Sequence, residues 1–75
     1  MTLQFHYDKE ADAAYIRLRA SGVPAVARTE VVDLQLESGA INLDFDEEGR
    51  LVGVEILGAR RLLPAELLTV TDSTG

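Results

Sequence analysis

The chain has 75 residues and a formal net charge of −6, with 13 acidic residues, seven basic residues and no cysteine. This length allows one domain with a small core, and the lack of cysteine excludes disulfides, thiolate metal sites and a cysteine nucleophile. The acidic balance and the scattered basic residues argue against a nucleic-acid-binding protein, which needs a basic stripe on its surface.

The sequence contains neither a secretory signal pattern nor a membrane-spanning pattern. The N-terminal segment MTLQFHYDKE lacks a basic region followed by an apolar run. No apolar run approaches the roughly 20 residues that span a bilayer. We therefore expect a soluble, cytoplasmic protein.

Alternation of apolar and polar residues predicts the strands in chain order. Residues 3–8 form the first strand, residues 9–12 a turn, residues 14–19 the second strand and residues 29–37 the third. The Ser-Gly-Val-Pro segment at 21–24 predicts a loop between the second and third strands. Residues 41–46 and 52–56 then alternate on both sides of the turn Asp46-Glu47-Glu48-Gly49, which predicts a β-hairpin with one buried face.

Two registers of this hairpin are possible. A three-residue loop with a glycine bulge pairs Asp46 with Arg50, and it splits the apolar face. A four-residue loop at 47–50 keeps the apolar residues together, and this is the register that we predict. Its pairs are Phe45 with Val52, Leu43 with Val54, and Ile41 with Ile56.

The C-terminal part predicts a short helix. Gly58 ends the last strand, and Pro64 is suited to the first turn of a helix at residues 64–68. Residues 69–75 are polar, so we expect a frayed tail after a single domain of residues 1–68. The predicted fold is α+β and mainly β, a small antiparallel β-meander of four to five strands with one short C-terminal helix. One helical turn covers little of a sheet face and the sheet edges stay exposed, so a homodimer is one expectation.

Several separated motifs resemble those of one family of small bacterial and archaeal proteins. They are YDKEADAAYIRL at 7–18, GRLVGVEIL at 49–57 and LPAELL at 63–68. The chain is similar in these motifs to domain-of-unknown-function family 2283, and it departs from the family pattern at Gly58-Ala59-Arg60. The resemblance implies a mainly β fold with a C-terminal helix and no established activity. Because some relatives look like partners of small toxin-like proteins, it also implies an antitoxin hypothesis.

An EF-hand-like pattern overlaps the hairpin. Counted as a calcium loop, residues 44–55 place Asp44, Asp46 and Glu48 at the early ligand positions and Glu55 at the last. However, the flanking segments alternate as strands, and carboxylates spread along strands do not converge on an ion. We therefore predict a solvated acidic turn with no metal and no cofactor.

The remaining polar residues show no catalytic pattern. Asp8, Glu10 and Asp12 form a second acidic cluster, for which turn shaping by backbone hydrogen bonds is the favoured interpretation over a cation or partner site. His6 is the only histidine, and strand alternation turns it toward solvent without a nucleophile beside it. We expect no catalytic residue and no enzyme activity.

The leading functional hypothesis is a protein–protein interaction module, in the form of an antitoxin-like neutralising partner of a small basic protein. The candidate partner-binding residues are Asp8, Asp12, Asp44, Asp46, Glu47 and Glu48. The alternative is a small-ligand or metal-binding domain that uses the acidic clusters. An enzyme ranks last, because so short a chain rarely encloses a pocket of roughly 300 Å³ or more. Nucleic acid and membrane are not expected partners.

Overall fold

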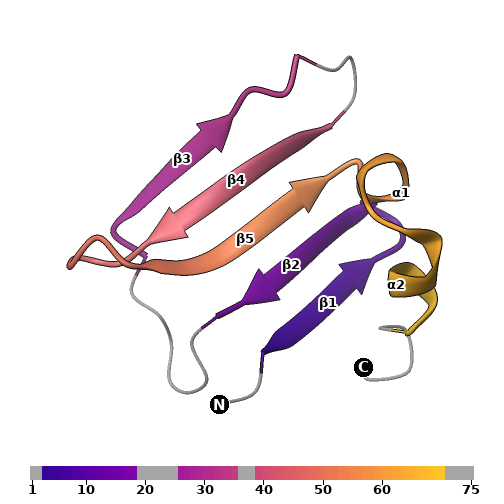
Figure 1. Ribbon diagram of the computed structural model, residues 1–75, viewed down its shortest axis with the longest axis horizontal. Helices are drawn as coiled ribbons and strands as arrows, with labels where there is room; N and C mark the ends of the chain where they lie inside the picture. The colour runs from indigo at the N-terminus through magenta and orange to yellow at the C-terminus, as the bar shows by residue number, and fades with distance from the viewer. Residues whose placement is uncertain (1–2, 19–25, 36–38, 71–75) are drawn as a thin grey trace.

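A five-stranded antiparallel sheet followed by two short helices makes up the protein (Figure 1). The structure is a computed structural model that describes residues 3–18, 26–35 and 39–70. The elements are β1 (Gln4–Asp8), β2 (Ala13–Arg17), β3 (Arg28–Val32), β4 (Ala40–Phe45), β5 (Leu51–Leu57), α1 (Ala59–Leu62) and α2 (Ala65–Val70). The mainly β, antiparallel fold predicted from the sequence is confirmed.

The strands follow the order β1-β2-β5-β4-β3, which is not that of a simple meander. A β1–β2 hairpin and a β3–β4–β5 meander are joined where β5 pairs with β2. This order places β2 and β5, which hold Ala14, Val52 and Ile56, in the interior of the sheet. The more polar strands β1 and β3 become the two edges.

The core lies between one face of the sheet and the helices. Ala14, Ile56 and Ala59 are its buried centre. The side chains that pack around them come from four strands and from the helical segment: Phe5, Tyr7, Ile16, Ile41, Val54, Leu62, Leu63 and Leu68. Both helices lie at the β1–β2 side of the sheet, and neither lies over β3 or β4 (Figure 1). The helices therefore cover only the β1–β2 side of the sheet (Figure 1).

The β4–β5 hairpin combines the two registers that the sequence allows. Ile41 pairs with Ile56 and Leu43 with Val54, as predicted. The prediction that Phe45 pairs with Val52 is wrong, because a β-bulge shifts the register and pairs Phe45 with Leu51. At the turn, the Asp46 N–H donates to the Arg50 carbonyl at 2.9 Å, which closes the three-residue loop. The bulge leaves Val52 without a partner on β4, and its side chain is buried, with 2% of its surface exposed.

The third strand ends earlier than predicted. β3 stops at Val32, whereas the alternation extends to residue 37. The Asp33 Oδ1 atom accepts a 2.8 Å hydrogen bond from the Gln35 N–H, and Gln35 has a φ of 58°. A local turn of this kind competes with strand pairing. Residues 36–38 and the predicted loop at 21–24 lie outside the described residues.

Two helices stand where one was predicted. The helix predicted at 64–68 is confirmed as α2, which extends to Val70. The four-residue helix α1 precedes it and begins after Gly58, which ends β5 with a φ of 76° and a ψ of 42°. Residues 71–75 of the predicted tail lie outside the described residues. No helix in the described part of the chain is long and apolar enough to cross a membrane.

Candidate functional site

The carboxylate of Asp8 shapes the β1–β2 turn. Its Oδ1 atom accepts hydrogen bonds from the backbone N–H groups of Glu10, at 3.0 Å, and Ala11, at 3.4 Å. This is an Asx turn, in which a side-chain oxygen substitutes for a backbone acceptor. The turn-shaping interpretation of this residue is confirmed.

Asp12 links the same turn to helix α1. Its backbone has a φ of 54°, and its carbonyl oxygen accepts hydrogen bonds from the N–H groups of Gly58 and Ala59, both at 3.0 Å. Its Oδ1 atom accepts from the Tyr7 hydroxyl at 2.8 Å and from the Arg60 backbone N–H at 3.0 Å. These bonds satisfy N–H groups at the start of α1 that have no partner within the helix. Asp12 is therefore a structural residue of this corner of the fold.

Asp44 is held in a hydrogen-bonded network on the polar face of the sheet. Its Oδ2 atom accepts from the Tyr15 hydroxyl at 2.9 Å, and its Oδ1 atom accepts from the Thr29 hydroxyl at 2.7 Å. Burial raises the pKa of Tyr15 above 10.0, and the hydrogen bond to Asp44 and its negative charge raise that pKa further. On the same face, the Asn42 amide donates to the Glu55 Oε1 atom at 2.9 Å. These contacts join β2, β3, β4 and β5 across the sheet.

The β4–β5 turn presents two carboxylates to solvent. The Asp46 Oδ1 atom is occupied within the turn, where it accepts the backbone N–H groups of Glu48 and Arg50, each at 2.9 Å. Glu48 lies 3.9 Å from the Arg50 guanidinium, and both side chains are exposed. No hydrogen bond or ion pair within the described residues engages the Glu47 side chain. Glu47 and Glu48 are thus the predicted partner-binding residues whose charge is least committed to folding.

The six predicted partner-binding residues do not form one surface. In the register of the sheet, Ala13 pairs with Leu57 at the end near the β1–β2 turn, and Arg17 pairs with Gly53 toward the β4–β5 turn. The turn with Asp8 and Asp12 and the turn with Asp46 to Glu48 therefore lie at opposite ends of the strands (Figure 1). Within the described residues, no three His, Asp or Glu side chains gather as metal ligands would.

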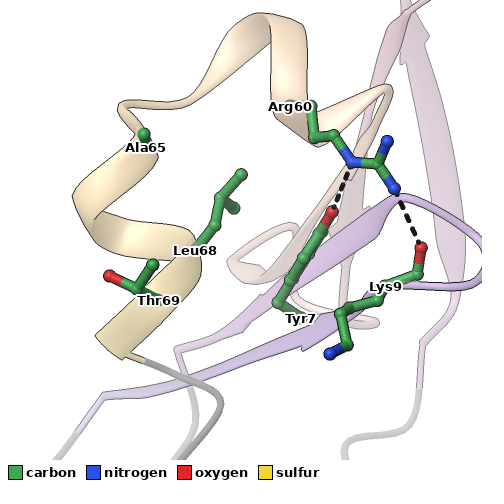
Figure 2. Close-up of a pocket in the computed structure, with 6 residues that line it drawn as sticks. All are labelled: Tyr7, Lys9, Arg60, Ala65, Leu68 and Thr69. Carbon is green, nitrogen blue, oxygen red and sulfur yellow. Dashed lines mark hydrogen bonds between the residues drawn. The ribbon is translucent and has the colours of Figure 1, made fainter.

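A groove that the sequence analysis did not find lies between β1 and the helices (Figure 2). It has a volume of about 570 Å³, and its lining residues are Tyr7, Lys9, Arg60, Ala65, Leu68 and Thr69. The two halves of this lining are about fifty residues apart in the sequence, and the two basic residues stand in unrelated local patterns. Only the docking of the helices beside β1 brings them together.

Comparison with known protein families identifies the family of this chain. The model of the DUF2283 family, described as proteins of unknown function, matches residues 4–60. The chain belongs to this family. The DUF2283 match includes all five strands and ends inside α1, so the LPAELL motif at 63–68 lies beyond it. No curated protein and no solved structure matches this DUF2283 chain.

Proposed function

We propose that this DUF2283 protein is a protein-interaction module whose partner is a small basic protein, which it neutralises in the manner of an antitoxin. The observation that supports this best is the exposed edge strand β3. Four of its five residues are exposed, and Val31 exposes 68% of its surface. No other strand of the described residues pairs with the outer side of β3. An open edge of this kind is a template for an added strand from a partner.

The acidic turn lies next to this edge. Arg28, the first residue of β3, pairs with Phe45, the last residue of β4, and the Ala27 N–H donates to the Phe45 carbonyl at 2.8 Å. Asp46, Glu47 and Glu48 follow Phe45 in the turn, so this acidic turn lies beside the start of β3. A basic extended segment added to β3 would gain main-chain hydrogen bonds from the edge and charge complementarity from the turn.

The overall charge supports a basic partner. At a net charge of −6, the chain attracts cations over a distance of about one Debye length, roughly 8 Å at physiological salt. Such attraction raises association rates and selects against acidic partners. The Arg28 guanidinium does not cancel this effect at the edge, because it is paired with Glu30 at 2.9 Å.

The test begins with affinity purification of the tagged protein from its native host and mass spectrometry of the co-eluting proteins. We expect a basic protein at one-to-one stoichiometry. The purified pair is then measured by titration calorimetry with the variant E47K/E48K and with E10K/E66K, which makes the same change of charge at exposed positions away from the edge. Loss of affinity in the first variant alone supports the proposal.

Two results would overturn the proposal. The first is recovery of no other protein, including the case in which the chain recovers only further copies of itself. The homodimer expected from the sequence would then be the occupant of the edge. The second is equal loss of affinity in both charge-reversal variants. That result would mean that binding depends on the net charge of the whole chain and not on the acidic turn beside β3.

A further inference from the structure

The groove between β1 and the helices differs in charge from the rest of the molecule. The chain as a whole has 13 acidic and seven basic residues, but the groove has two basic residues, Lys9 and Arg60, and no acidic residue in its lining. Its volume of about 570 Å³ falls within the roughly 300–1,000 Å³ that small-molecule sites occupy. A basic groove of this size on an acidic protein indicates an anionic ligand.

The lining combines this charge with an apolar wall. Leu68 projects from α2 into the space between the helices and Tyr7, and Ala65 lies one turn earlier on the same helix (Figure 2). The ring of Tyr7 faces them from β1. An apolar body of a ligand can therefore pack between α2 and this ring, with the cationic groups at the rim.

Arg60 is held in place at this rim by weak contacts. Its Nε atom donates to the Tyr7 hydroxyl at 3.4 Å and lies 3.8 Å from Asp12 Oδ1, and its Nη2 atom donates to the Lys9 carbonyl at 3.5 Å. Protein hydrogen bonds of this type are usually about 2.7–3.2 Å long, so these are long ones. A ligand carboxylate would form shorter, charge-assisted bonds with the same guanidinium. The existing contacts hold the Arg60 guanidinium in position, and they are weak enough for a ligand carboxylate to form stronger bonds with it.

We propose that this groove binds a small amphipathic carboxylate. The apolar body lies against Leu68, Ala65 and the Tyr7 ring, and the carboxylate is bound by Arg60. The ammonium of Lys9, at the other end of the Tyr7 side chain, adds positive charge to the groove (Figure 2). The site is separate from the β3 edge and the acidic turn, so it stands or falls independently of the proposed protein partner.

The test is a titration of the ¹⁵N-labelled protein, followed by NMR, with 4-phenylbutyrate as the probe. We expect a dissociation constant of about 1 mM for a ligand of this size. The shifts are expected to localise to residues 7–9 and 60–69. The neutral amide of the same acid and acetate should each bind at least about tenfold more weakly, because one lacks the charge and the other the apolar body.

Two variants and one control assign the site. Arg60→Gln removes the charge and Ala65→Phe fills the groove from an exposed position, and each should weaken binding of 4-phenylbutyrate about tenfold. Arg61→Gln removes the same charge from the neighbouring position, which does not line the groove, and should bind as the parent protein does. Equal binding of the acid and its amide, an equal response to acetate, or undiminished binding by both Arg60→Gln and Ala65→Phe would overturn the proposal.

Discussion

The phenol of Tyr15 lies across the backbone of Gly53, and its hydroxyl reaches Asp44 beyond it at 2.9 Å. Tyr15 is on β2, Gly53 on β5 and Asp44 on β4, so one side chain crosses the central strand β5 and links its two neighbours. A Cβ atom on residue 53 would overlap the phenolic oxygen and would lie 2.5 Å from Cζ. The absence of a side chain at position 53 is therefore what allows this contact.

The first prediction concerns Gly53→Ala. The added methyl group must displace the Tyr15 phenol, which also breaks the hydrogen bond to Asp44. We expect the free energy of unfolding to fall by about 3 kcal/mol, since overpacking alone costs about 1–3 kcal/mol. Urea denaturation followed by circular dichroism measures this loss.

Two further variants separate the clash from other effects of losing a glycine. In the Tyr15→Ala background the clash is absent, so Gly53→Ala should then cost less than about 1 kcal/mol. Gly49→Ala meets no atom within 4 Å but has a φ of 83°, and it should cost only about 1–2 kcal/mol of backbone strain. An unchanged cost of Gly53→Ala in the Tyr15→Ala background would contradict the steric explanation.

The second prediction concerns alkaline pH. The pKa of Tyr15 is raised above 10.0 in the folded protein, first by burial and then by the hydrogen bond to Asp44 and its charge. The unfolded chain therefore releases this proton at lower pH than the folded chain does. The contribution to stability is fully present below about pH 10 and is lost as the pH rises through the folded pKa. Tyrosinate absorbance should show one late-titrating group.

Variants assign this alkaline loss to the Tyr15–Asp44 pair. Tyr15→Phe should remove the late-titrating group and flatten the fall of stability above about pH 10. Asp44→Asn should lower the pKa of Tyr15 toward its ordinary value, because the neighbouring negative charge is gone. A late-titrating signal that persists in Tyr15→Phe would refute this prediction.

The third prediction concerns Asp12, which joins the β1–β2 turn to α1. Asp12→Ala loses the acceptor for the Tyr7 hydroxyl and the Arg60 N–H, and alanine adopts the φ of 54° less readily. We expect a loss of about 2–3 kcal/mol in the free energy of unfolding. Asp12→Asn keeps an acceptor oxygen and tolerates this conformation, so it should cost about 1 kcal/mol or less.

Hydrogen exchange distinguishes this local role from a general loss of stability. The amides of Gly58, Ala59 and Arg60 bond to Asp12, so their protection should fall first in Asp12→Ala. Equal loss of protection across β4 and β5 would show instead that the substitution acts on the whole fold.

The alternating segments of the sequence were sufficient to predict the strands and most of the hairpin. Period-2 alternation is a local signal, and burial of one face fixes the pairing of Ile41 with Ile56 and Leu43 with Val54. The strand order was not predictable in the same way, because the pairing of β2 with β5 depends on which strands gain most from an interior position. The bulge at Val52 was missed because either register satisfied part of the local pattern.

The predicted site residues divide in the same way, into those with local contacts and those with distant ones. Asp8 and Asp46 accept N–H groups two to four residues away, so turn chemistry predicts their role. Asp12 accepts a hydrogen bond from Arg60, 48 residues away, and Asp44 accepts one from Tyr15, 29 residues away. The groove is likewise assembled from distant segments. Contacts of this range follow from the docking of elements, and no spacing in the sequence encodes them.

The fourth prediction tests where the core ends and where the proposed interface begins. Val52 is 2% exposed and Val31 is 68% exposed, so the same Val→Ala change samples the interior and the β3 edge. Val52→Ala should lower the free energy of unfolding by about 1–3 kcal/mol, and Val31→Ala should change it by no more than about 0.5 kcal/mol. Thermal denaturation of both variants gives the comparison.

The two substitutions should have the opposite order of effect on binding affinity. If a basic partner adds a strand to β3, Val31→Ala removes an apolar contact from that interface and should weaken binding by about 1 kcal/mol, while Val52→Ala in its folded form should bind normally. A destabilised Val31→Ala variant would show that the edge is already covered within the protein. If a stable Val31→Ala variant binds the partner as the parent protein does, the Val31 side chain is not part of the interface. The acidic turn alone would then remain as the proposed contact.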